Sequence, residues 1–208
     1  MAPKNKYTRD EFIDAAIAII RENGAGSLTA KSLADRLGIS TRPVFTCFES
    51  MDNLRSDVRK RAIDIYKEYE RRGLEDPVAS RGIGREYISF ARNERELYRL
   101  IFMSGSDSLF NPIEYISDLV YPSLSTIYSF SESECRFFIT CMWLMIHGIS
   151  ALIVNGSCPY SDDEISAILS RESMSIYRTI RDIPMFSDLK EDIDDNICTE
   201  CIRRRGEK

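Results

Sequence analysis

The chain has 208 residues, of which 43% are hydrophobic and 29% charged, with a formal net charge of −5. It is long enough to bury a hydrophobic core as one domain or two, and its composition is that of an ordinary globular protein. A single histidine excludes multi-histidine metal sites and most catalytic triads built on histidine.

Other sequence signatures of enzymes are also missing. The chain contains no glycine-rich phosphate loop after a strand, no nucleophile elbow and no metalloprotease helix motif. The pair Cys198 and Cys201 offers two zinc ligands where four are needed. We therefore predict no catalytic residue, no metal and no cofactor, and expect that the chain is not an enzyme.

The charge is distributed unevenly along the chain. Residues 1–60 hold 10 Lys and Arg against 8 Asp and Glu, a net +2, and residues 61–208 carry a net −7. A positive end attracts phosphates, while an acidic body disfavours the wrapping of DNA around it.

No segment of the sequence has the pattern of a membrane span or a secretion signal. The longest apolar run, 137–154, is interrupted by Thr140, His147 and Ser150 among others, and it is shorter than the about 20 apolar residues of a spanning helix. We expect a cytoplasmic protein without a membrane partner, whose six cysteines are reduced.

The first predicted helix begins with a capping box. In Thr8-Arg-Asp-Glu11 the hydroxyl and the carboxylate each accept from a backbone amide at the helix start. The apolar positions that follow have helical spacing. Beside the cap, a basic arm of Lys4, Lys6 and Arg9 either contacts DNA or is simply solvated.

The segment 28–54 has the pattern of two short helices joined by a tight turn. Leu33, Ala34 and Leu37 are spaced as on one helix face after a cap at Thr29, and Gly38 suits the left-handed end of a helix. The second helix is expected over 40–47, capped by Ser40, with Pro43 tolerated in its first turn. This pattern predicts a helix-turn-helix, a motif that inserts its second helix into the major groove of DNA.

The remaining pattern is helical to the end. Ser50 is expected to cap a long helix that Gly73 ends, and Pro122 to kink or restart a later one. Long helices are expected over 131–156 and 161–181, followed by a tail over 185–208.

These residues resemble the head of the tetracycline-repressor (TetR) family of transcriptional regulators. The resemblance covers about residues 8–60, with a looser likeness at Trp143 to Gly148. The matching head positions are Thr29, Leu33-Ala34, Gly38-Ile39-Ser40, Val44-Phe45, Phe48, Ser50 and Leu54.

The resemblance implies an all-α fold with a DNA-binding head over 1–52 and a helical effector-binding and dimerisation body over 53–208. It further implies a ligand-responsive regulator, by family default a repressor, that binds a pseudo-palindromic operator in double-stranded DNA as a homodimer. The alternative is a helical ligand-binding or adaptor protein that keeps the head and has lost specific DNA binding.

Arg42 is the residue expected to read a base, because arginine to guanine is the commonest specific contact; a phosphate contact is the alternative. Three positions depart from the family pattern: Phe45, Cys47 and Met51 lack the polar groups that usually face phosphates, which lowers affinity without changing sequence choice. The predicted DNA-binding set is Thr29, Lys31, Ser40, Thr41, Arg42, Pro43, Phe45, Thr46 and Cys47.

Two further sets of residues are predicted in the body. Aromatic and sulfur-containing side chains either line a pocket for an unidentified small-molecule effector or form plain core: Tyr66, Tyr69, Tyr87, Phe90, Tyr98, Phe102, Met103, Met142, Trp143 and His147. The resemblance implies that the last two long helices pair with their copies in a four-helix bundle, and burial within one chain is the alternative. The predicted dimerisation residues are Phe138, Met145, Leu152, Ile165, Ile168, Leu169 and Ile176.

Overall fold

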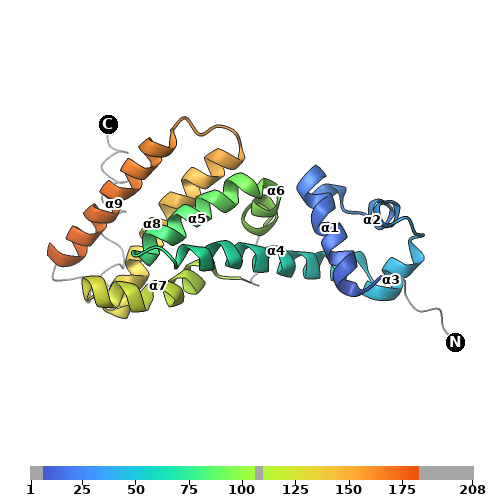
Figure 1. The fold of residues 1–208 in the computed structure, drawn as a ribbon, viewed down its shortest axis with the longest axis horizontal. Coiled ribbons are helices and arrows are strands. Elements are labelled where there is room, and N and C mark those ends of the chain that lie inside the picture. The colour runs from blue at the N-terminus through green and yellow to red at the C-terminus, as the bar shows by residue number, and fades with distance from the viewer. Residues whose placement is uncertain (1–6, 106–109, 183–208) are drawn as a thin grey trace, which may run out of the picture. The chain divides into compact units, whose positions relative to one another are not determined.

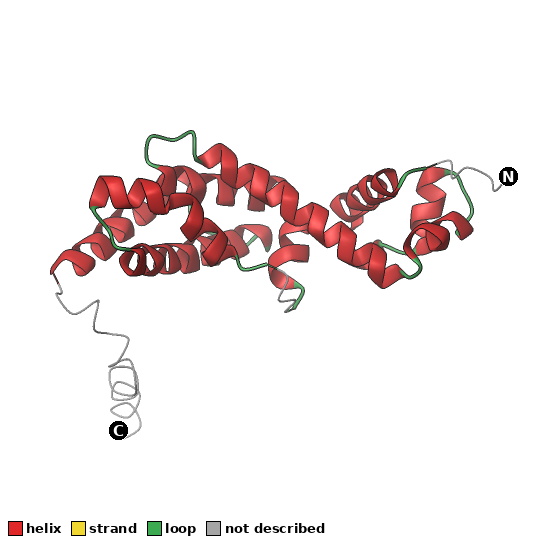
Figure 2. Cartoon of the chain, turned by 90° about the horizontal axis from the view of Figure 1, so that it is seen from below, coloured by secondary structure: helices red, strands yellow, loops and turns green. Residues whose placement is uncertain are grey.

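The computed structural model describes residues 7–105 and 110–182, and the regular elements in these ranges are all helices (Figures 1 and 2). The predicted all-α class is confirmed for the described part of the chain. The chain forms two compact units, one of Met1–Pro112 with Ile146–Pro159 and one of Ile113–Met145 with Tyr160–Lys208. The division into a head and a body after residue 52 is a functional one and stays a prediction.

The head consists of three helices, α1 (Arg9–Asn23), α2 (Ala30–Leu37) and α3 (Arg42–Phe48). Both predicted helix starts are confirmed: Thr8 and Thr29 each accept from the backbone amide three residues on, and each forms a capping box. The short 3-10 turn η1 (Ala25–Ser27) joins α1 to α2. Local hydrogen bonding therefore sets where the first two helices begin.

The turn between α2 and α3 agrees with the prediction in its glycine and differs in its cap. Gly38 has φ 63° and ψ 40°, the left-handed conformation that glycine adopts without strain. The expected cap at Ser40 is wrong, because the first helical carbonyl is that of Thr41, which accepts from Val44 and Phe45. The helix accordingly begins at Arg42 and extends to Phe48, one residue beyond the expected end.

The head has its own aromatic and aliphatic core. The rings of Phe12 and Phe48 meet edge to face at 5.9 Å, and Leu33, Val44 and Leu54 are fully buried. Burial of these side chains on α1, α2, α3 and the start of the next helix holds the helix-turn-helix together.

The fourth helix, α4 (Met51–Gly73), is capped by Ser50 as predicted and lies beside α5 (Ala79–Asn93), as Figure 1 shows. Gly73 was expected to stop α4, but it is the last residue of the helix. Its lack of a side chain allows the backbones of α4 and α5 to approach each other closely. A Cβ at Gly82 would lie 2.0 Å from the Gly73 carbonyl oxygen, and a Cβ at Gly73 would lie 2.5 Å from the Ile83 nitrogen. The two helices therefore cross backbone to backbone.

A short element follows α5 and ends in an unusual turn. Helix α6 (Arg95–Tyr98) continues into the π-helical segment η2 (Arg99–Met103). The Arg59 guanidinium on α4 donates to the carbonyls of Leu100 and Ile101 at 2.6 and 3.0 Å. These bonds satisfy backbone acceptors that the π-turn exposes.

The remaining helices are α7 (Pro112–Tyr128), α8 (Glu132–Val154) and α9 (Asp162–Asp182). Helix α7 runs on through Pro122, so the expected restart there is wrong. Ser131 and Ser161 each exchange hydrogen bonds with the glutamate three residues on, which fixes the starts of α8 and α9. Cys198, Cys201 and the rest of the predicted tail lie outside the described residues.

Helix α8 is the only described helix that is long and apolar enough to cross a membrane by those two criteria. Of its most apolar window, 39% is buried inside the fold. In its own unit, Phe138 on α8 contacts Phe130, which also contacts Tyr177 on α9. This helix therefore contributes to an aromatic core.

The glycine crossing generates a stability prediction. We expect Gly82→Ala to lower the free energy of unfolding by about 3 kcal/mol, because the added methyl forces α4 and α5 apart. Chemical denaturation measures this. The control is Gly148→Ala on α8, where a Cβ meets nothing within 4 Å, and which should stabilise by up to about 1 kcal/mol. An unchanged Gly82→Ala variant would contradict the close approach.

Candidate DNA-binding surface and candidate effector site

Helix α3 buries one face and exposes the other. Val44 and Phe48 are 1% exposed in the head core, whereas Arg42, Phe45 and Thr46 are exposed, Phe45 by 46%. A short helix anchored on one side and open on the other is able to enter a major groove.

The remaining predicted DNA-contact residues surround this face. Thr29, Lys31, Ser40 and Thr41 are exposed, and Pro43 and Cys47 are half-buried. The Thr46 hydroxyl donates to the Arg42 carbonyl at 3.0 Å, so its donor is used within the helix.

Arg9, which was grouped with a free basic arm, is held inside the head. Its guanidinium pairs with Asp57 on α4 at 2.6 Å, donates to the Cys47 carbonyl at 2.8 Å and lies 4.4 Å above the ring centre of Phe48. A cation over an aromatic face and an ion pair stabilise the same position. Arg9 therefore braces α3 against α1 and α4, while Lys4 and Lys6 lie outside the described residues.

Six of the predicted pocket residues come together in the first compact unit, and we call them the aromatic cluster. The Tyr66 ring contacts the rings of Tyr87 and Phe90 at 5.7 and 5.4 Å, with edge-to-face geometry. The cluster consists of Tyr66 on α4, Tyr87 and Phe90 on α5, Tyr98 on α6, Phe102 on η2 and His147 on α8.

One end of the aromatic cluster is polar. The hydroxyls of Tyr87 and Tyr98 both lie 2.9 Å from His147 Nδ1. Burial lowers the pKa of His147 and raises the pKa of Tyr98 to about 12, so both groups are neutral at neutral pH. Apolar walls with a few converging polar groups are typical of small-molecule sites.

The other predicted pocket residues lie apart from this cluster or at its edge. Tyr69 contacts Phe90 at 5.3 Å and carries the Arg72 guanidinium 4.0 Å above its ring. Met103 is 44% exposed, so its side chain lines no interior site in this structure. Met142 and Trp143 belong to the second compact unit, and their role in a pocket stays a prediction.

The sequence analysis missed one buried residue, Glu70. The fully buried line of α4 runs through Ala62, Tyr66 and Glu70. The i, i+4 spacing from Tyr66 was the available signal. Most glutamates lie on the solvated surface, so the residue type alone gives no sign of this burial.

Glu70 is fully buried without an ordinary partner. Neither of its carboxylate oxygens has a hydrogen-bond partner among the described residues. Burial raises the pKa of Glu70 to about 8, the nearby Glu86 carboxylate adds to the shift, and the Tyr66 hydroxyl opposes it. The carboxyl is therefore mostly protonated at neutral pH.

The predicted dimerisation residues divide by exposure. Phe138 and Ile165 are buried within their own chain and leave little surface for a second copy, whereas Leu152 is 39% exposed. The most exposed apolar side chains among the described residues were not predicted: Leu144 on α8 at 59% and Met174 on α9 at 50%. Met145, Ile168, Leu169 and Ile176 are half-buried.

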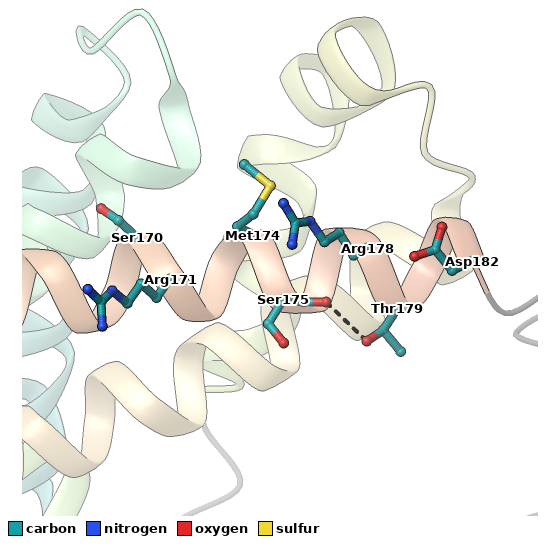
Figure 3. Close-up of a pocket in the computed structure, with 7 residues that line it drawn as sticks. All are labelled: Ser170, Arg171, Met174, Ser175, Arg178, Thr179 and Asp182. Carbon is teal, nitrogen blue, oxygen red and sulfur yellow. Dashed lines mark hydrogen bonds between the residues drawn. The ribbon is translucent and has the colours of Figure 1, made fainter.

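Met174 lies on an open face formed entirely by α9 (Figure 3). In this view the Arg178 guanidinium lies beside Met174, and Arg171, one turn earlier, projects toward the opposite edge of the helix. Methionine and arginine are both enriched in protein–protein interfaces, so an exposed methionine beside an arginine is typical of such a surface.

Known proteins match both the sequence of the body and the fold. Residues 80–172 match the family model described as the tetracyclin repressor-like C-terminal domain. A TetR family member from Streptomyces coelicolor A3 is similar with a TM-score of 0.53 at 17% identity, over 81% of this chain and 98% of that one. A TetR-like transcriptional regulator from Rhodococcus sp. RHA1 is similar with a TM-score of 0.54 at 13% identity, over 87% and 99%. No curated protein matches the chain.

Glu70 generates a prediction for the pH dependence of stability. Its pKa is higher in the folded chain, about 8, than the unfolded value of 4.5, so the folded chain binds more protons and loses stability as the pH rises through this range. Between pH 6 and 8 the loss should be roughly 2 kcal/mol. Denaturation at several pH values measures it.

The variant Glu70→Gln should flatten this pH dependence, because the amide does not titrate. The control Glu68→Gln, at an exposed position of the same helix, should keep the slope of the wild type. An identical slope in the Glu70→Gln variant would show that another group is responsible.

Proposed function

We propose that the chain is a transcriptional regulator of the tetracycline-repressor family, and more finely a cytoplasmic, ligand-responsive repressor that binds a pseudo-palindromic operator as a homodimer. The match of its body to the family's C-terminal domain over residues 80–172 supports a transcriptional regulator, and the two similar structures support the fold. The matched residues 80–172 lie in the body, and the three helices of the head are consistent with the resemblance seen in the head motif. The observation that carries the finer proposal is the exposed face of α3.

That face supports base reading by Arg42. The residue begins α3 and is exposed, and its guanidinium forms no hydrogen bond or ion pair with the other described residues, so it is available. Arginine recognises guanine through two parallel hydrogen bonds in the major groove. Thr41 and Thr46 beside it supply hydroxyl and methyl surface, and Lys31 on α2 supplies a charge for phosphate.

The exposed apolar side chains on α8 and α9 support the homodimer. Leu144 on α8 is 59% exposed and Met174 on α9 is 50% exposed. Pairing of these helices with a second copy would remove them from water. A twofold pair then presents two α3 helices to successive half-sites about 34 Å apart.

The aromatic cluster supports an effector site coupled to the head. Phe102 lies on η2, whose carbonyls hold Arg59 of α4, and Glu94 beside α6 pairs with Arg21 of α1 at 2.6 Å. A ligand that favours one arrangement of these elements shifts the head between states by its difference in affinity for the two.

Selection from random duplex DNA tests operator binding. We expect enrichment of a palindrome, whereas flat binding would favour an adaptor that has lost base reading, as the apolar side chains at Phe45, Cys47 and Met51 allow. Arg42→Ala should relax preference at one base pair per half-site and cost about 1–3 kcal/mol there.

Lys31→Ala is the matched control for base reading. As a phosphate contact it should weaken all sequences about equally and reduce the salt slope by about 1. If Arg42→Ala behaves in the same way, Arg42 contacts phosphate and the base is read by other groups.

A charge on α8 tests the dimer. Leu144→Glu should convert the dimer to a monomer in analytical ultracentrifugation, because a carboxylate buried in an apolar interface is strongly unfavourable. Ile127→Glu on α7 is the control, since Ile127 is similarly exposed, at 48%, and lies off both pairing helices. A Leu144→Glu variant that remains dimeric would place the interface elsewhere.

A further inference from the structure

Glu70 combines complete burial with carboxylate oxygens that make no well-aligned hydrogen bond to the described residues, and the Tyr66 hydroxyl is the one group that favours the charged form. It lies one helical turn after Tyr66 on α4, on the same buried line of the helix. The Tyr66 ring is surrounded by four aromatic rings at centroid distances from 5.3 to 5.7 Å: Tyr87, Phe90, Phe102 and Phe110. The carboxyl group thus lies next to the aromatic cluster.

The charged neighbours of Glu70 do not compensate it. Glu86 on α5 is itself acidic, and it pairs with Arg72 at 3.3 Å. Arg72 in turn lies over the ring of Tyr69, at a largely exposed position. Burying a carboxylate with one hydroxyl beside it and no cation is unfavourable, so a ligand that brings a cation to this place would stabilise the charged form.

We infer that Glu70 anchors a ligand that carries a protonated amine beside an aromatic body. The amine pairs with the carboxylate, and the aromatic body packs among the rings around Tyr66. Aromatic faces attract cations as well, so both parts of the site select the same chemistry. The inference rests on the proposed function and specifies the chemical class of its effector.

Binding of such a ligand changes the protonation of the site in a defined way. In the free protein Glu70 is mostly the neutral acid below pH 8. When the ammonium group arrives, the carboxyl releases its proton to solvent, and the resulting carboxylate pairs with the cation. The ligand keeps its proton throughout. Each binding event at pH 7 therefore releases close to one proton.

Two probes of equal size test this chemistry on the full chain, 1-naphthylmethylamine and 1-naphthylmethanol. Isothermal titration calorimetry in two buffers of different ionisation enthalpy measures both affinity and proton release. We expect the amine to bind at least tenfold more tightly than the alcohol at pH 8. Its affinity should rise nearly tenfold from pH 6 to 7 with proton release, while the alcohol shows neither effect.

The Glu70→Gln variant should lose the selectivity and nothing else. We expect the amine to lose at least tenfold in affinity, together with its pH dependence and proton release, while binding of the alcohol is unchanged. Glu68→Gln, exposed on the same helix, should behave as the wild type. The wild-type proton release stands as a test on its own if the variant folds poorly.

Three results would overturn the inference: equal affinity of the two probes, no binding of the amine to the wild type, or a pH dependence that survives in Glu70→Gln. The assay contains no DNA, so its outcome is independent of the test of operator binding. If the alcohol binds as tightly as the amine, the proposed effector site is retained and its selectivity for a cation is disproved. A failed operator selection with intact amine binding would remove the regulator proposal alone.

Discussion

The structure depends above all on a single helix that serves two cores. The first turns of α4 bury Leu54 and Val58 against the head, and later turns place Tyr66 in the aromatic cluster. A rigid helix fixes the relative rotation of side chains on its successive turns, so these two packings are not independent within the first compact unit. The crossing at Gly73 then holds the end of α4 directly against α5, where no side chain intervenes.

Much of this arrangement could be predicted from local pattern. Capping boxes at Thr8 and Thr29, the left-handed glycine at Gly38 and the cap at Ser50 follow from side-chain chemistry within three residues of a helix end, and such signals need no tertiary context. The start of α3 was misplaced because the carbonyl of Thr41 begins that helix without help from a side chain. Backbone angles at that turn are set by packing, which spacing alone does not reveal.

The parts that escaped prediction depend on partners distant in sequence. The close approach of Gly73 and Gly82 depends on how two helices cross. Without knowledge of that crossing, a glycine in the sequence predicts only the end of a helix. Arg9 looked like part of a basic arm because its partners Asp57 and Cys47 are about 40 residues away. The burial of Glu70 was not predicted for a related reason. A change of one residue in the position of the buried face of the helix decides whether a glutamate is exposed or buried.

The π-helical segment η2 gives a physical reason why the cluster and the head should respond together. A π-turn inside a helix is less stable than the α-helical register and persists where other contacts hold it. Here Arg59 binds two of its carbonyls from α4, and Phe102 on the same segment packs against Tyr98 and His147. A ligand that shifts the backbone of η2 at Phe102 would therefore either strain the Arg59 hydrogen bonds or move α4 with them. Because α4 also carries Asp57, the partner of Arg9, such a movement would change the ion pair that holds Arg9 against α3.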